Sequence, residues 1–184
     1  MRRDVIVRLF VESFMDDPYF EWICRDVTIR RTLLLSVFEA AVAAADHQGY
    51  LHQRGENAAI IVLPPGKPLY DPRTSASIGN LYYECSDQEP ELLDDYFQQV
   101  EENVPSELCW YLFYLATHTP SRRRGFASSL IEDVLQLSRE SGNPVFLHTA
   151  RVELLPFYKS FGFEAVASIA CIDGPQLFCL MASP

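Results

Sequence analysis

Positive charge is scarce in this chain of 184 residues, which has 15 lysines and arginines against 25 aspartates and glutamates. The net charge of −10 and the pI near 4.8 do not provide the broad basic surface that nucleic acids or anionic membranes require. We therefore expect neither a nucleic acid nor a membrane as a partner. A cationic or amine partner fits this charge better.

Paired cysteines and long apolar runs are also missing. The five cysteines form no C-x-x-C pair, and the histidines at 47, 52, 118 and 148 are not spaced with them as zinc ligands are, so we expect no metal site. An odd number of cysteines, several of them in apolar runs, indicates reduced thiols in a cytoplasmic protein. No apolar run approaches the length of a membrane span, and charges at Arg8 and Glu12 argue against a signal peptide.

Two nucleotide-binding fingerprints are absent as well. Neither G-x-x-x-x-G-K-[ST] nor G-x-G-x-x-G occurs, which excludes a P-loop and a dinucleotide fingerprint. The sequence does contain "RRRGFA", Arg122–Ala127, between an apolar run and a helical pattern. The first N–H groups of a helix lack internal partners, and Gly125 lets an anion approach them closely. This pattern predicts an anion site; the alternative is a solvated helix start with adjacent arginines.

The order of the predicted elements indicates one α/β domain over residues 1–184, built on a mixed sheet. Pro18 is expected to end the first helix, and residues 64–75 are expected to form a loop rich in proline. The unbroken apolar run at 109–116 predicts a strand buried on both faces. We expect helices at 4–14, 28–46, 90–103, 122–141 and 153–160 and strands at 50–55, 58–66, 109–116, 144–149, 163–172 and 175–182.

"RRRGFA" resembles the acetyl-CoA-binding motif [QR]-x-x-G-x-[GA] of the GNAT N-acetyltransferase superfamily. The strand end "YLATHTP" before it and "PFYKSFGFEAV" after it are similar to the segments that flank this motif in the family. The N-terminal segments "FVESFMDDPYFEWI" and "IIVLPPG" are similar to the puromycin N-acetyltransferase-like branch. Two positions depart from the family pattern: Arg123 stands where many members have glycine, and Glu153-Leu154 where many have an asparagine.

The resemblance implies a GNAT-like domain with a mostly antiparallel central sheet flanked by helices, and acetyl-CoA as its cofactor. It makes Tyr158 the general acid for the departing thiolate; the alternative is an aromatic that only packs. The cofactor-binding residues that it implies are Leu115, Ala116, Thr117, Arg122, Arg123, Arg124, Gly125, Phe126, Ala127 and Ser128.

Several residues are candidates for the general base. His148 comes after the motif helix on a predicted strand and has a suitable ordinary pKa, although it could equally be a strand histidine without a role in the reaction. Glu107 borders the apolar run and could act through water, or be a surface carboxylate. Asp16 and Asp17 line the acceptor site if the resemblance to the puromycin branch holds; otherwise they mark a turn.

The interval 74–121 holds no lysine or arginine, which predicts either a solvated acidic face or an electrostatic attraction for a cationic amine. We expect an enzyme, monomeric or homodimeric, that moves an acetyl group directly to a primary amine of a small molecule. Alternatives are a protein or peptide N-acetyltransferase and a CoA-binding module without catalysis. The acidic residues of this interval are Glu84, Asp87, Glu89, Glu91, Asp94, Asp95, Glu101, Glu102 and Glu107.

Overall fold

Most elements form where their local signals place them in the computed structural model, which describes residues 3–105, 108–170 and 172–184. The helices are α1 (Arg3–Phe14), α2 (Pro18–Ile23), α3 (Val27–Gln48), α4 (Pro72–Cys85), α5 (Pro90–Asn103), α6 (Phe126–Ser141) and α7 (Leu155–Lys159). The strands are β1 (Leu51–Arg54), β2 (Ala58–Leu63), β3 (Trp110–Thr117), β4 (Val145–Thr149), β5 (Glu164–Ala170) and β6 (Gln176–Ala182). Two short 3₁₀ helices are η1 (Thr119–Ser121) and η2 (Val152–Leu154).

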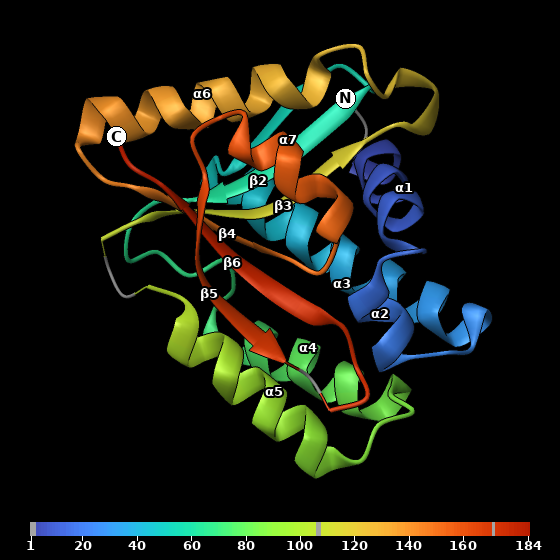
Figure 1. Ribbon diagram of the computed structural model, residues 1–184. Coiled ribbons are helices and arrows are strands. Elements are labelled where there is room, and N and C mark those ends of the chain that lie inside the picture. The colour runs from blue at the N-terminus through green and yellow to red at the C-terminus, as the bar shows by residue number, and fades with distance from the viewer. Residues whose placement is uncertain (1–2, 106–107, 171) are drawn as a thin grey trace.

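The strands form one sheet in the order β1-β2-β3-β4-β6-β5. All neighbouring strands are antiparallel except β3 and β4, which are parallel because α6 connects them. Figure 1 shows α6 running along the upper side of the sheet and α7 in front of β3 and β4. The predicted single α/β domain with a mostly antiparallel sheet and flanking helices is confirmed.

Two helices begin where the sequence predicted a helix end or a loop. Asp17 accepts a hydrogen bond from the N–H of Tyr19, and Pro18 is the first residue of α2. Asp71 caps α4 in the same way, with Pro72 as its first residue. A proline fits this position because the N–H that it lacks would have no partner in the helix. The first helix ends before Pro18 as predicted, at Phe14, but the sequence analysis did not predict that α2 begins there, and the predicted loop at 64–75 ends earlier, at Asp71.

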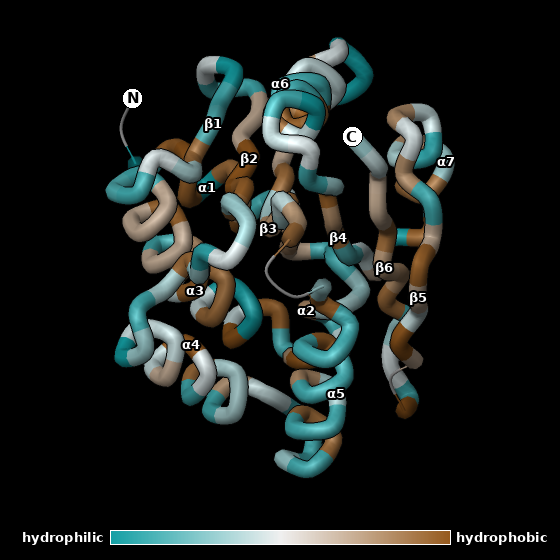
Figure 2. Tube along the Cα trace, turned by 90° about the vertical axis from the view of Figure 1, so that its left-hand side faces the viewer, coloured by the Kyte–Doolittle hydropathy of each residue, from teal (hydrophilic) through white to brown (hydrophobic). Residues whose placement is uncertain are grey.

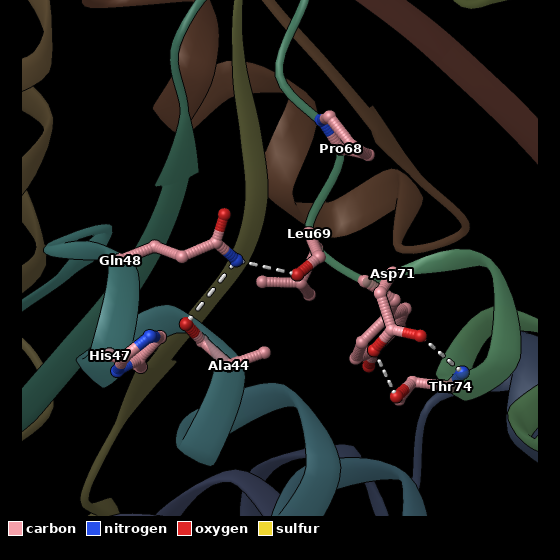
Figure 3. A pocket seen from close by; sticks show the side chains of 8 residues that line it. Ala44, His47, Gln48, Pro68, Leu69, Asp71 and Thr74 are labelled. Carbon is pink, nitrogen blue, oxygen red and sulfur yellow. Dashed lines mark hydrogen bonds between the residues drawn. The ribbon is translucent and has the colours of Figure 1, made fainter.

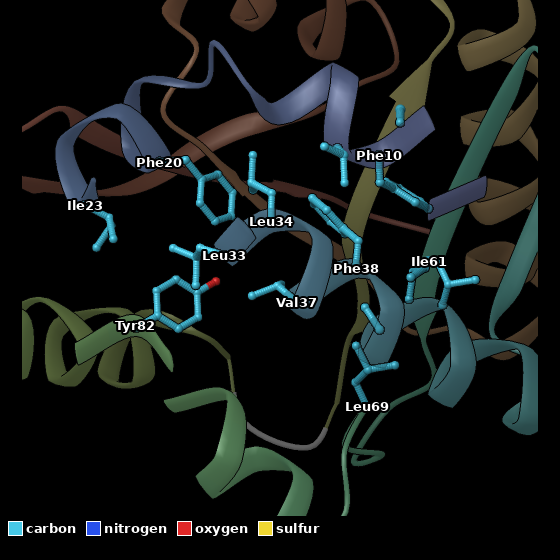
Figure 4. Close-up of a cluster of buried hydrophobic side chains, with 14 of the residues drawn as sticks. Phe10, Phe20, Ile23, Leu33, Leu34, Val37, Phe38, Ile61, Leu69 and Tyr82 are labelled. Atoms are coloured by element: carbon cyan, nitrogen blue, oxygen red, sulfur yellow. The ribbon is translucent and has the colours of Figure 1, made fainter. Parts of the chain in front are cut away.

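The core lies in two layers, one on each face of the sheet. The larger layer packs α1 to α5 against the sheet and contains Phe10 and Phe38, whose rings stack at 5.2 Å (Figure 4). The smaller layer packs α6 and α7 through Leu130, Val134 and Tyr158. Figure 2 shows α1 and α3 on one side of β2 and β3, and α7 on the opposite side of the molecule. Among the described helices, none is long and apolar enough to cross a membrane.

Strand β3 is less buried than its sequence predicts. Of its eight residues only Leu112 and Ala116 are buried; the others are half-buried. Its side chains pack into both core layers, as predicted for a strand covered on both faces, but most of them keep some exposure. The reason is that most of the apolar run lies beside an opening in the sheet, where β3 separates from β4.

Candidate active site

The segment before α6 is a turn with two residues in the left-handed region of backbone space. Arg123 has φ 61° and Gly125 has φ 82°. A right-handed helix cannot include such residues, so α6 begins at Phe126 and the predicted helix start at residue 122 was wrong. Left-handed residues in a turn can direct neighbouring backbone N–H groups toward one side, an arrangement that binds anions.

The start of α6 adds further unpartnered donors to this turn. Gly125 is the N-cap residue of α6 and has no side chain that could accept from the N–H groups of Phe126, Ala127 and Ser128. A Cβ placed on Gly125 would have no described atom within 4 Å, so the backbone here is open to a ligand. The positive end of the dipole of this 16-residue helix favours a negatively charged ligand at the same place.

The three arginines of the turn keep their charges available. Arg122, Arg123 and Arg124 are exposed, and none has an ion pair with a described carboxylate. The Arg124 guanidinium lies over the Phe126 ring, 5.5 Å from its centroid. In a chain of net charge −10, such a concentration of free cations at a helix start fits a phosphate-bearing cofactor.

Replacing Arg123 by glycine is expected to stabilise the fold by about 1 kcal/mol, since a left-handed conformation is costly for residues with a Cβ. The same change removes one cation, so the affinity for CoA should fall severalfold. Arg122→Gly is the matched control, because Arg122 has φ −62° and gains no relief. Chemical denaturation and calorimetry measure both effects; equal stabilities of the two variants would contradict the expected relief.

Beside this turn the sheet opens between β3 and β4. The two strands pair only at Trp110–Val145 and Tyr111–Phe146, although β3 continues for six more residues. Phe113 is an extra residue of β3 opposite the junction of Ile61 and Val62, and such bulges bend a strand. From Leu112 onward, the edge of β3 that faces β4 has no strand partner in the described chain.

The predicted residues Leu115, Ala116 and Thr117 lie at the far end of this free edge. On their other side they pair with β2, so only the edge toward β4 remains open. Backbone groups of an unpaired strand edge can accept an extended ligand as an additional strand. The turn at 122–125 comes directly after η1, so a few residues connect the open edge to this turn.

Tyr158 lies in α7 within the smaller core layer. Its ring makes edge contacts with Phe157 and Phe163 at 5.4 and 5.8 Å. Burial raises the pKa of its phenol, and the Asp17 carboxylate raises this pKa further. The hydroxyl group therefore remains protonated throughout the working pH range, and it lies close enough to Asp17 for their charges to interact.

Asp17 and Arg151 form an ion pair that the sequence did not predict. Their side chains meet at 3.1 Å between Oδ2 and Nε, and Asp17 also caps α2. Burial raises the pKa of the Asp17 carboxyl, and the Arg151 guanidinium opposes this rise. Both carboxylate oxygens accept hydrogen bonds, so Asp17 holds the α1–α2 turn against the segment after β4. Asp16, in contrast, is exposed.

His148 lies on β4 where β3 turns away. Its Nδ1 is 2.7 Å from the hydroxyl oxygen of Tyr111, a residue that no sequence motif marks as functional. His148 keeps some accessible surface, but its ring is deep enough that burial lowers its pKa from 6.5 to about 4. His148 is therefore neutral at pH 7.

The lowered pKa of His148 makes stability depend on pH. Above pH 6.5 the imidazole is neutral in both the folded and the unfolded chain; between pH 6.5 and about 4 only the unfolded chain takes up the proton. We expect acidification over this window to lower the free energy of unfolding by up to about 3 kcal/mol through this group. His148→Gln should show a shallower decline in denaturation midpoints, and equal slopes would contradict the burial of the ring.

The structure places Tyr158 and His148 on opposite sides of β4. Tyr158 belongs to the layer of α6 and α7, whereas Tyr111, the partner of His148, packs against the layer of α1 to α5. Because β3 and β4 separate beyond residue 111, the opening between them connects the two faces. Glu107, the other candidate base, lies outside the described residues.

Two cavities lie elsewhere on the molecule. The larger, about 430 Å³, lies between the end of α3 and the start of α4 (Figure 3), and the other, about 290 Å³, lies beside Lys67 and Tyr111. None of the predicted site residues lines either cavity. In Figure 3 the amide of Gln48 donates to Leu69, and Asp71 accepts from Thr74, so these polar groups are already satisfied within the protein. The smaller cavity touches the candidate site through Tyr111, the partner of His148, whereas the larger one lies apart from it.

Comparisons with known proteins agree with this geometry. Residues 98–178 match the family model of the acetyltransferase (GNAT) domain, and these residues include the turn, the opening and Tyr158. An uncharacterised N-acetyltransferase of Schizosaccharomyces pombe is 23% identical over 171 residues, covering 86% of this chain and 69% of that protein.

Two solved structures share the fold over almost the whole chain. A histone acetyltransferase-related protein of Corynebacterium glutamicum superimposes with a TM-score of 0.64 at 20% identity, covering 99% of this chain and 91% of that one. An agmatine N-acetyltransferase superimposes with a TM-score of 0.62 at 14% identity, covering 99% and 94%. The match to the GNAT acetyltransferase domain thus covers residues 98–178 of this chain, and the arginine turn and the division of the sheet both lie within this stretch.

Proposed function

We propose that this protein transfers an acetyl group from acetyl-CoA directly to a primary amine of a small molecule. The chain is an acyltransferase with acetyl-CoA as its cofactor. The observation that carries the specific proposal is the opening between β3 and β4 directly beside the turn at 122–125. A ligand whose phosphates bind the turn could extend along the free edge of β3 and reach the opening.

The residues of the turn and of β3 would hold the cofactor. The backbone N–H groups of Gly125 to Ser128 and the three free arginines would bind its phosphates, and Leu115–Thr117 would pair with its extended arm. When bound, acetyl-CoA supplies the acetyl thioester. The protein contributes orientation, which alone can account for a large share of the acceleration of an acyl transfer.

Tyr158 would stabilise the departing sulfur. Its hydroxyl is a protonated donor in a buried setting, and such a donor acts more strongly on a developing negative charge than it would in water. His148 borders the same opening from the other face of the sheet. With a pKa near 4 it is a weak proton acceptor, although the sequence favoured it as a candidate base.

A small cationic or neutral amine is the acceptor that we favour. The interval 74–121 has no lysine or arginine, and its acidic residues on α4 and α5 give this part of the surface a negative field that attracts amines. The similarity of the fold to the agmatine N-acetyltransferase, and of the N-terminal segments to the puromycin branch, supports the same choice. The reduced cysteines favour a cytoplasmic location.

A protein acceptor is the second candidate, because one structural neighbour is related to histone acetyltransferases. Release of free CoA thiol from acetyl-CoA distinguishes the two candidates when small diamines, amino sugars and peptides are offered side by side. We expect turnover with a small amine. Acetylation of peptides alone would replace the proposed acceptor class, and thiol release with no acceptor of either kind would argue against both.

A further inference from the structure

The hydrogen bond between Tyr111 and His148 lies at the place where the sheet divides. Tyr111 is at the last paired position of β3 and β4, and His148 stands two residues beyond its register partner Phe146. The ring centroids are 5.7 Å apart, and the hydroxyl oxygen and Nδ1 are separated by 2.7 Å. The first three residues of β4 are buried, whereas His148 and Thr149 are only half-buried, so accessible surface begins at the histidine.

In the hydrogen bond between Tyr111 and His148, the available donors and acceptors determine which residue supplies the proton. Tyr111 is half-buried, and its hydroxyl keeps its proton because burial strongly raises the pKa of this phenol. In the described chain its hydroxyl has no hydrogen-bond partner other than His148. A buried hydroxyl hydrogen without an acceptor is costly, so Tyr111 has to donate to Nδ1.

Among the described residues that line the cavity beside Tyr111, Lys67 is the charged one. Burial is the cause of the lowered pKa of His148, and the ring is neutral. Titratable groups that interact with Tyr111 are the phenol of Tyr114 and the thiols of Cys109 and of Cys179, which lies on β6 directly opposite His148. Burial raises the pKa of both thiols, so they are neutral as well. A neutral imidazole that accepts at Nδ1 carries its single proton on Nε2.

We propose that Tyr111 is a positioning residue that fixes His148 as the Nε2–H tautomer, so that His148 offers a hydrogen-bond donor to the reacting groups instead of accepting their proton. This proposal rests on the proposed function, which places the reaction at the opening between β3 and β4. A neutral imidazole that donates in this way can stabilise a developing oxyanion. Because Nε2 already carries a proton, it cannot accept the proton of the amine. That proton is then transferred to water.

Nuclear magnetic resonance of the ¹⁵N-histidine-labelled full chain tests the tautomer without reference to activity. Long-range ¹H–¹⁵N correlations distinguish a protonated from an unprotonated ring nitrogen, and the His148→Gln variant assigns the signal among the four histidines. We expect one Nε2–H tautomer between pH 6 and 8. A signal with the proton on Nδ1, or a charged ring at pH 7, would overturn the proposal in the wild-type protein itself.

Tyr111→Phe tests whether the Tyr111 hydroxyl causes His148 to adopt the Nε2–H tautomer, since this substitution keeps the ring and removes the hydroxyl. We expect the ¹⁵N shifts of His148 to move toward a mixture of tautomers, whereas Tyr83→Phe, an exposed hydroxyl that donates to Asp94, should leave them unchanged. Unchanged shifts in a folded Tyr111→Phe protein would remove Tyr111 from this role.

Kinetics of the same variants separate this proposal from the proposed function. We expect kcat of Tyr111→Phe to fall about tenfold, the effect of one buried hydrogen bond, with the KM for acetyl-CoA unchanged. Wild-type kcat in this variant would show that the orientation of His148 is irrelevant to the reaction. If the wild-type protein acetylates no amine, the proposed function fails while the tautomer measurement still stands.

Discussion

Tyr158→Phe is expected to lower kcat about 10²–10³-fold, while the KM for acetyl-CoA stays close to its wild-type value. The substitution retains the ring and its contacts with Phe157 and Phe163, and removes only the hydroxyl. The hydroxyl is the group that would donate to the sulfur as negative charge develops there. Because this interaction strengthens in the transition state, its loss appears in kcat rather than in cofactor binding.

The size of this effect depends on the environment of Tyr158. Burial and the neighbouring Asp17 carboxylate both raise the pKa of the phenol, so complete proton transfer to a thiolate is unfavourable. Stabilisation by a hydrogen bond remains, which places the expected effect below the upper limit for general acids.

Tyr82→Phe is the matched control for Tyr158→Phe. Tyr82 is also buried and its hydroxyl is hydrogen-bonded to Tyr114, but it belongs to the core layer of α1 to α5. Losing this hydroxyl should lower the free energy of unfolding and leave kcat unchanged. If Tyr158→Phe turns over at the wild-type rate at saturating substrate over the whole accessible pH range, Tyr158 is a packing residue only.

Gly125→Val should weaken the binding of CoA at least about tenfold, which corresponds to about 1.4 kcal/mol. A side chain at this position would enter space that no described atom occupies, between the helix start and an approaching phosphate. It would also be strained, since Gly125 has φ 82° and β-branched residues avoid this region. Calorimetric titration of CoA into the apo-protein measures the affinity.

Gly142→Val provides a control at the other end of the same helix. Gly142 has φ 70° and is equally open, so the valine should cost similar stability there. It stands far along α6 from the turn at 122–125 and should not change the affinity for CoA. A Gly125→Val protein that is folded and binds CoA as the wild type does would place the phosphate site elsewhere. Equal losses of affinity in both variants would point to the helix as a whole.

Short stretches of sequence were enough to locate most helices and strands and the arginine turn. Helices α5 and α6 lie where apolar spacing places them, and α6 ends at Gly142 because glycine adopts the left-handed conformation of that cap. Strands β1 and β2, which pair as an antiparallel hairpin, lie within the predicted strand ranges 50–55 and 58–66. These features depend on residues within a few positions of each other, so a single sequence contains their signals.

Local signals for the start of a helix were also present at α2 and α4, two helices that the sequence analysis did not predict. Asp17-Pro18 and Asp71-Pro72 each combine a capping side chain with a proline that suits the first helical position. The same dipeptide also occurs in turns, so the short pattern by itself is ambiguous. Packing resolves the ambiguity, since α2 and α4 are held against the core around α3.

The arrangement of the candidate site residues, in contrast, depends on contacts that arise only when the chain folds. The ion pair of Asp17 and Arg151 joins residues 134 positions apart, and Tyr111 meets His148 across 37. No periodicity records such contacts, because they depend on the order of the strands and on where β3 leaves β4. The sequence could name Tyr158, His148 and the arginine turn as candidates. Only the tertiary structure decided that Tyr158 and His148 lie on opposite sides of β4, because α7 packs in one core layer whereas His148 meets Tyr111 in the other.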